Sequence, residues 1–225
     1  MKHITFYLDF ISPYAYLAFE HLPEVLQCTS YSVAYTPVLF AGMLKHHGQL
    51  GPAEITPKRH WTYRQVLWQA QRLGIDMQMP AAHPFHPLAL LRLAAACGNA
   101  NPAGTPNRFV CEQIFRHVWQ GGAAADDTSR LSTLMQALSS TPALEGFDLP
   151  ALSQGDAAKA RVKTSTDDAI ARDVFGVPAF AVDDKVFWGL DALPMLRDYL
   201  LGDAWFDGPD WDAACQVPAA VTRQK

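Results

Sequence analysis

The chain has 225 residues, of which 49% are hydrophobic and 18% are charged. That share of apolar side chains supports a folded core, which excludes a disordered chain. The net charge is −4 and there is no basic stripe, which argues against a nucleic-acid partner. No apolar run approaches the ~18 residues that span a bilayer, and the first ten residues resemble a strand rather than a signal peptide. We therefore expect a cytoplasmic protein with no membrane partner.

The four cysteines are far apart in the sequence, and none forms a CxxC pair. Scattered cysteines in a chain without an export signal are more often buried thiols than disulfides or zinc ligands. Cys111 fits this interpretation because it falls on an apolar helix face with Ile114, Phe115 and Val118. The other three cysteines are Cys28, Cys97 and Cys215.

The amino-terminal segment predicts a strand, a helix and a second strand. Residues 4–8 are rich in β-formers, and Ser12 followed by Pro13 is typical of a helix N-cap and first helical position. The helix should end before Thr29, and residues 31–35 predict the second strand. A right-handed crossover would make the two strands parallel.

The middle of the chain predicts helices. Residues 39–56 resemble a loop because glycines and Pro52 interrupt them, whereas residues 57–173 show mostly helical spacing. Thr105-Pro106 is expected to cap one of these helices. Besides the Cys111 stripe and a compact apolar helix at 88–97, the expected buried stripes are Tyr63, Val66, Leu67 and Ala70, and Leu131, Leu134, Met135 and Leu138.

Strand character returns near the carboxyl terminus. Ala179–Val182 and residues 186–188 flank a hairpin turn at Asp183-Asp184-Lys185. A last helix is expected to start at Asp191, followed by a tail over residues 202–225. Its expected buried stripe is Leu193, Leu196 and Leu200.

This order of elements predicts an α/β protein with a thioredoxin-like fold (βαβ…ββα) and a large inserted all-helical domain. The expected boundaries are 1–38 and 174–201 for the thioredoxin-like domain, 39–173 for the inserted helical domain, and 202–225 for the carboxyl-terminal tail. A fold of this kind does not by itself name an activity.

Three local features could bind a ligand. Ser12 lies where a helix N-terminus favours an anion, so its hydroxyl is either a plain N-cap or a donor to a ligand's thiolate. Val177–Pro178 before a strand is either an ordinary trans bond or a cis turn that frees the Val177 backbone to pair with a peptide. Asp191 either caps its own helix or holds an α-ammonium group.

Four segments carry a resemblance to a known family. They are FYLDFISPYAYLA (6–18), GPAEITPKR (51–59), HPFHPLALLRLA (83–94) and VFGVPAFAVDDKVFWGLDAL (174–193). On these segments the chain resembles the 2-hydroxychromene-2-carboxylate isomerase family, in the disulfide-oxidoreductase-like branch of the thioredoxin superfamily. It is also similar to kappa-class glutathione transferases. The resemblance spans roughly residues 1–201.

The resemblance implies that glutathione is the cofactor and that the protein is a homodimer. The thiol would lie near Ser12, and addition of the thiolate to a conjugated enone would let a C=C bond rotate. The glutathione-binding residues that it implies are Ser12, Val177, Pro178, Trp188, Gly189, Leu190 and Asp191.

The residues on the substrate side are weaker candidates, because each has an ordinary structural interpretation. Lys45 and Lys58 could meet a substrate carboxylate, or could simply be solvated. Phe85, His86 and Trp119 could line an apolar pocket, although aromatic side chains are more often core.

We expect no metal site. His83 and His86 have metal-like spacing, but Pro84 and Pro87 break any helix that would align them.

With the resemblance, we expect a glutathione-dependent isomerase that acts on 2-hydroxychromene-2-carboxylate or a related aromatic enone acid. A kappa-like transferase that conjugates electrophiles is an alternative within the same superfamily. A thioredoxin-like binding module without catalysis is an alternative of another class. Disulfide exchange is the least favoured activity, since no cysteine stands at or near Ser12.

Overall fold

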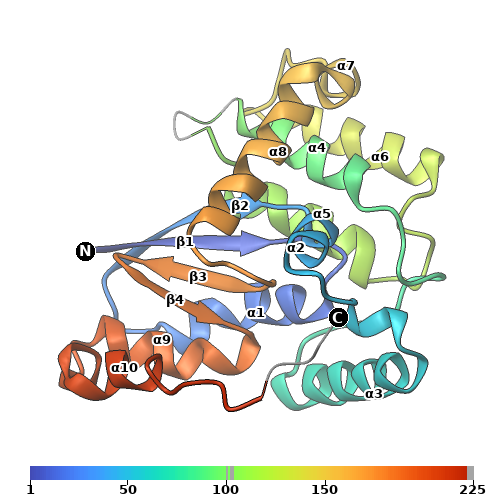
Figure 1. Ribbon diagram of the computed structural model, residues 1–225. Coiled ribbons are helices and arrows are strands. Elements are labelled where there is room, and N and C mark those ends of the chain that lie inside the picture. Colours follow the sequence, from blue (N-terminus) through green and yellow to red (C-terminus); the bar gives the residue numbers. More distant parts are fainter. Residues whose placement is uncertain (100, 102–103, 222–225) are drawn as a thin grey trace.

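The structure is a computed structural model that describes residues 1–99, 101 and 104–221 (Figure 1). Its strands are β1 (Lys2–Leu8), β2 (Tyr31–Pro37), β3 (Ala179–Val182) and β4 (Lys185–Trp188). Its α-helices are α1 (Pro13–Val25), α2 (Phe40–His47), α3 (Thr56–Leu73), α4 (Leu88–Gly98), α5 (Arg108–Trp119), α6 (Thr128–Ser139), α7 (Leu149–Gln154), α8 (Asp156–Ala171), α9 (Leu193–Leu200) and α10 (Pro209–Ala214). Short 3₁₀ turns are η1 (Pro52–Glu54), η2 (Leu190–Ala192) and η3 (Ala204–Asp207).

The four strands form one mixed sheet in the order β2-β1-β3-β4. The first two are parallel, in register from Lys2 opposite Tyr31 to Leu8 opposite Pro37, because α1 crosses between them. β3 runs antiparallel to both β1 and β4. The prediction of a thioredoxin-like βαβ…ββα fold interrupted by helices is therefore confirmed.

Alternation along β1 divides the core between the two faces of the sheet. Phe6 and Leu8 join the large cluster that contains the buried residues of α1 and α9. Tyr7 points the other way and packs with Met43 of α2 and Ala169 of α8. This period of two explains why the strand is apolar on both sides from Phe6 to Leu8, since helices cover both of its faces there.

The loop predicted over residues 39–56 is wrong, because Phe40–His47 is helix α2. Its first backbone N–H, on Phe40, donates to the Asp9 carboxylate at 2.9 Å, and Met43 is buried. Gly48, with φ 64°, ends the helix in the left-handed conformation, so it is a C-cap rather than a sign of a loop.

The helical stripes of the middle region are largely confirmed. Cys111, Ile114, Phe115 and Val118 are buried on α5. Leu67 of α3 is instead 40% exposed, because α3 lies at the edge of the molecule and buries only a narrow face with Val66 and Ala70. Tyr63 and Met135 are only half-buried. Helix α7 was not expected.

Two predicted helix starts are corrected by capping geometry. Asn107, not Thr105-Pro106, caps α5, since its side chain accepts the N–H of Val110 at 2.9 Å. Asp191 lies in the turn η2, and α9 begins two residues later, with Leu193 and Leu196 buried and Leu200 half-buried.

The segment after α9, predicted as a tail, contains the short helical elements η3 and α10 and packs against the body of the protein. Phe206 is buried, and its ring lies 5.9 Å from that of Phe187 in β4 and 5.5 Å from that of Trp211 in α10. Lys185 lies over the Trp211 ring. Aromatic contacts therefore attach residues 204–214 to the sheet. Within the described part of the chain, no helix has the length and apolar character to cross a membrane.

Candidate active site

Ser12 lies at the junction of β1 and α1 and is 7% exposed. Its Oγ accepts the Ala15 N–H at 3.2 Å, so the residue is the N-cap of α1. The same hydroxyl donates to the carbonyl oxygen of Val177 at 3.4 Å. The hydroxyl therefore sits where the positive end of α1 meets the segment before β3, positions that are 165 residues apart.

The Val177–Pro178 peptide bond is cis. β3 begins only at Ala179, and among the described residues the Val177 N–H has no hydrogen-bond partner. The Pro178 carbonyl accepts the N–H of Gly189 at 2.9 Å, which fixes the end of β4 beside this turn. Val177 thus offers a peptide N–H next to Ser12.

Gly189 and Asp191 form a close turn after β4. Gly189 has φ 104°, and a Cβ there would lie 2.3 Å from Asp191 Oδ1, so only glycine fits. The Asp191 carboxylate is exposed and has no hydrogen bond to the described residues. It does not cap α9, whose N-cap is Ala192. The turn η2, which contains Asp191, contacts α1. Burial and, to a smaller extent, the Asp191 charge raise the pKa of Tyr14 in the first turn of α1.

Trp188 provides an exposed aromatic surface beside the cis turn. Its indole Nε1 would lie 2.7 Å from a Cβ on Gly176, so the ring covers that backbone closely. The ring also contacts Phe175, with 4.8 Å between centroids. Leu190, in the turn η2, is half-buried.

Asp9 is fully buried below the Ser12 segment. It accepts the N–H groups of Ile11 at 3.2 Å and Phe40 at 2.9 Å. Burial raises the pKa of its carboxyl to about 7, although these N–H donors act in the opposite direction. Sequence reasoning missed this residue, because nothing local shows that the end of β1 is covered by α2.

The candidate substrate residues differ in exposure and come from different elements of the helical region. Lys45, Lys58 and His86 are all exposed, on α2, on α3 and before α4 respectively. Trp119 has no exposed surface, and its indole N–H donates to the Phe10 carbonyl at 3.0 Å. Trp119 therefore belongs to the core and cannot line a substrate pocket as predicted. Phe85 is also buried.

No thiol stands beside Ser12. All four cysteines are free, with Cys97 and Cys111 buried in the core and the other two exposed. Burial raises the pKa of Cys97 to about 12 and that of Cys111 further, so neither is a reactive thiolate. Disulfide exchange at this helix end therefore has no nucleophile in the chain.

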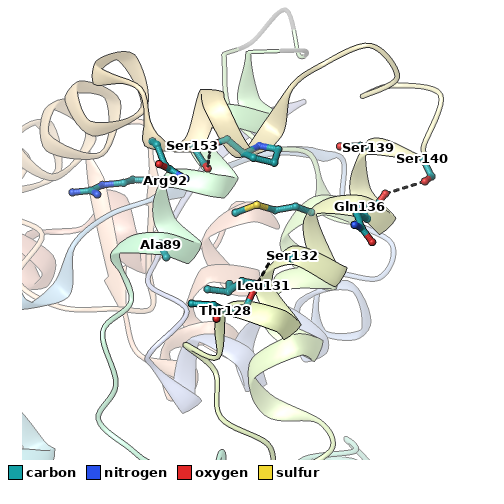
Figure 2. Close-up of a pocket in the computed structure, with 12 residues that line it drawn as sticks. Ala89, Arg92, Thr128, Leu131, Ser132, Gln136, Ser139, Ser140 and Ser153 are labelled. Carbon is teal, nitrogen blue, oxygen red and sulfur yellow. Dashed lines mark hydrogen bonds between the residues drawn. The ribbon is translucent and has the colours of Figure 1, made fainter.

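A hollow of about 710 Å³ is lined by residues of α4, α6 and α7. Figure 1 shows these three helices apart from α1 and β3. Figure 2 shows that several serines lining the hollow bond to the backbone of their own helix. These are Ser132 to Thr128, Ser140 to Gln136 and Ser153 to Pro150. The hydrogens of these three hydroxyl groups are therefore already used within the protein.

A four-stranded mixed sheet with a cis-proline facing a helix N-terminus defines the thioredoxin-like class. At the start of α1 this chain carries the hydroxyl of Ser12. Residues 3–201 match the family model of the DSBA-like thioredoxin domain. The chain is 30% identical to the 2-hydroxychromene-2-carboxylate isomerase of Sphingobium xenophagum (89% of this chain, 98% of the relative). It is 31% identical to the 2-hydroxychromene-2-carboxylate isomerase of Pseudomonas putida (86% of this chain, 92% of the relative).

A solved structure of a 2-hydroxychromene-2-carboxylate isomerase superposes with a TM-score of 0.72 at 26% identity, covering 93% of this chain and 98% of that one. The glutathione S-transferase kappa 2 of Caenorhabditis elegans is 24% identical over 92% of this chain and 95% of its own. The chain belongs to the 2-hydroxychromene-2-carboxylate isomerase family, within the DSBA-like thioredoxin domains. These named isomerase relatives are enzymes of the isomerase class.

Proposed function

We propose that the protein is a glutathione-dependent isomerase that interconverts 2-hydroxychromene-2-carboxylate and trans-o-hydroxybenzylidenepyruvate or a related aromatic enone acid. The observation that carries the proposal is the Ser12 hydroxyl, which lies at the N-terminus of α1 and 3.4 Å from the Val177 carbonyl. A hydroxyl in this place can stabilise a thiolate but cannot exchange disulfides. The names of the isomerase relatives supply the reaction.

The chemistry of the surrounding groups fits a γ-glutamyl peptide with a thiol. The unpaired Val177 N–H can pair with the backbone of an extended peptide beside Pro178. The free carboxylate of Asp191 can hold an α-ammonium group, and the backbone of the turn at Gly189 and Leu190 would face the α-carboxylate. Trp188 can cover the apolar part of such a ligand. The names of the kappa-class relatives point to the same compound.

When bound, glutathione would supply a thiolate able to add reversibly to a conjugated C=C bond, which permits rotation about that bond. Ser12 would turn its one hydroxyl hydrogen from the Val177 carbonyl to the sulfur, and the first N–H groups of α1 would favour the negative charge. The two exposed lysines, Lys45 and Lys58, would attract and orient the substrate carboxylate. His86, next to the buried Phe85, would border the aromatic ring.

A kappa-like transferase is the second candidate, because kappa-class enzymes of Caenorhabditis elegans and Rattus norvegicus are among the relatives. The two reactions differ in stoichiometry, since an isomerase releases glutathione unchanged and a transferase consumes it. A binding module without catalysis would bind glutathione without turnover, or would not bind it.

The first experiment is a thermal melt with and without millimolar reduced glutathione. Ligand at ~100 times its Kd adds about 2.7 kcal/mol to the native state, which raises the Tm by several degrees. S-methylated glutathione, which lacks the thiol hydrogen, is the control and should give a smaller shift. Turnover of the chromene acid with full recovery of glutathione supports the isomerase, and loss of glutathione supports the transferase. No shift at saturation would contradict both.

A cytoplasmic location, a homodimer and the domain boundaries at 38–39 and 173–174 are part of the same proposal. Light scattering at working concentration tests the dimer. One hydrophobic cluster runs through both the sheet and the helical region, from Ile4 to Leu149 and Leu196. We therefore expect the two parts to unfold in one transition.

A further inference from the structure

Two ring N–H groups from the helical region hold consecutive carbonyls of the segment that carries Ser12. Trp119 Nε1 donates to the Phe10 carbonyl at 3.0 Å, and His83 Nε2 bonds the Ile11 carbonyl at 2.8 Å. The two rings lie against each other, with 5.6 Å between centroids. Both donors come from the region between β2 and β3, whereas both acceptors follow β1.

The hydrogen bonds of His83 determine which ring nitrogen carries the proton. A carbonyl only accepts, so Nε2 must carry a hydrogen. Burial lowers the pKa of His83, which favours the neutral ring. Nδ1 is then an acceptor, and the Tyr63 hydroxyl lies 2.8 Å from it and 2.7 Å from the His83 carbonyl. Because Nε2 keeps its hydrogen in the neutral and the charged ring, the bond to Ile11 survives protonation.

The other side of the same segment is held by Asp9. Its carboxylate accepts the Ile11 N–H at 3.2 Å, and its backbone carbonyl accepts the Ser12 N–H at 3.0 Å. Ile11 is therefore fixed through both its N–H and its carbonyl. The carbonyl of Ile11 belongs to the peptide unit that leads into Ser12, so its orientation sets the direction of the Ser12 side chain.

We propose that His83, oriented by Tyr63, is a positioning residue that holds the Ile11 carbonyl and so aims the Ser12 hydroxyl at the thiol site beside Val177. The effect on catalysis rests on the proposed function, whereas the effect on residues 9–12 does not. A donor must lie within a few tenths of an ångström of its best position to stabilise charge in a transition state. A segment held from two sides meets that requirement better than a free loop.

The test compares His83→Leu, which removes the donor, with His83→Gln, whose amide nitrogen can replace Nε2. His117→Leu is the matched control, because His117 Nε2 also bonds a backbone carbonyl, that of Ala125, at 2.9 Å. Burial likewise lowers the pKa of His117. Its bond lies between α5 and the segment before α6, away from Ser12.

The first readout is amide hydrogen exchange of the Ser12 and Ala15 N–H groups in the ligand-free protein. We expect exchange about tenfold faster in His83→Leu, partial restoration in His83→Gln, and no change in His117→Leu. Equal exchange in the His83→Leu and His117→Leu proteins would overturn the proposal, whatever the protein catalyses.

The second readout separates kcat from KM. His83→Leu should lower kcat by about 10- to 100-fold and leave the KM for glutathione within about threefold, because Val177, Gly189 and Asp191 are untouched. If His83→Leu does not fold, Tyr63→Phe is used in its place. We then expect a smaller fall in kcat than for His83→Leu, and faster exchange of the Ser12 N–H than in the wild-type protein. Wild-type kcat together with wild-type exchange at Ser12 in Tyr63→Phe would contradict the role. If the wild-type protein shows no turnover, only the proposed function is refuted. The hydrogen-exchange result does not depend on turnover, so it still tests the role of His83.

Discussion

The carboxylate of Asp9 accepts the backbone N–H of Phe40 at 2.9 Å, which joins the end of β1 to the first turn of α2. The same carboxylate holds Ile11, one residue before Ser12. A single buried group thus connects the Ser12 segment to the helix that carries Lys45. Its protonation state therefore matters for stability.

Stability should fall as pH rises through the acidic range. Burial raises the pKa of Asp9 to about 7, whereas an unfolded aspartate titrates near about 3.9. Between these two pH values the native state binds a proton that the unfolded state has lost. The free energy of unfolding therefore falls by up to roughly 4 kcal/mol as the pH rises from the lower value to the higher one, and it stays level at higher pH. Denaturant unfolding of Asp9→Asn should lack this decline. Asp184→Asn, on the exposed hairpin turn, should keep it, and parallel profiles for all three proteins would contradict the assignment.

Replacing Ser12 by alanine should separate catalysis from capping. Loss of the donor should cost roughly 2–4 kcal/mol of transition-state stabilisation, about 30- to 1,000-fold in kcat. Loss of the bond to the Ala15 N–H should cost about 1 kcal/mol of stability. Asp148→Ala removes the equivalent cap of α7, on the Ala151 N–H, and should lower stability without affecting kcat. Unchanged turnover in Ser12→Ala would refute its catalytic role.

Gly189→Ala should weaken glutathione binding through Asp191. The new Cβ would lie 2.3 Å from Asp191 Oδ1, which must move away. We expect the Kd for glutathione, measured by calorimetry, to rise about tenfold or more, as for a lost charged hydrogen bond. Gly202→Ala is the control, because Gly202 has φ 84° with no atom within 4 Å of an added Cβ. Gly202→Ala should introduce the strain of a positive φ without displacing any neighbour. An equal rise of the Kd for glutathione in both variants would therefore contradict the role of Asp191.

Lys45→Ala and Lys58→Ala test the substrate side. Exposed ion pairs contribute about 0.2–1 kcal/mol, so each variant should raise the KM for the acidic substrate about two- to fivefold and less at high salt. The Kd for glutathione should not change. Lys163→Ala on α8, where Lys163 pairs with Asp167, removes the same charge elsewhere. If Lys163→Ala raises the KM as much as Lys45→Ala or Lys58→Ala does, the change reflects the net charge of the protein and not a contact with the substrate.

Features that depend on near neighbours in the chain were predictable. The Ser12-Pro13 pair starts α1 as expected, because an N-cap bond spans only three residues. The stripe that includes Cys111 and Phe115 is buried because helical spacing places it on one face. The order of strands and helices was enough to identify the thioredoxin-like sheet, since connection handedness leaves few alternatives.

The tertiary structure alone decided how the Ser12 segment is held. The bonds from His83 to Ile11 and from Trp119 to Phe10 span 72 and 109 residues, so no local pattern could pair them. Packing also placed Trp119 in the core rather than in a pocket, and it buried Asp9 under α2. A buried polar group must find a partner wherever the fold brings one. The sequence by itself determined which group stands at the start of α1, and the packed helical region determined where that group points.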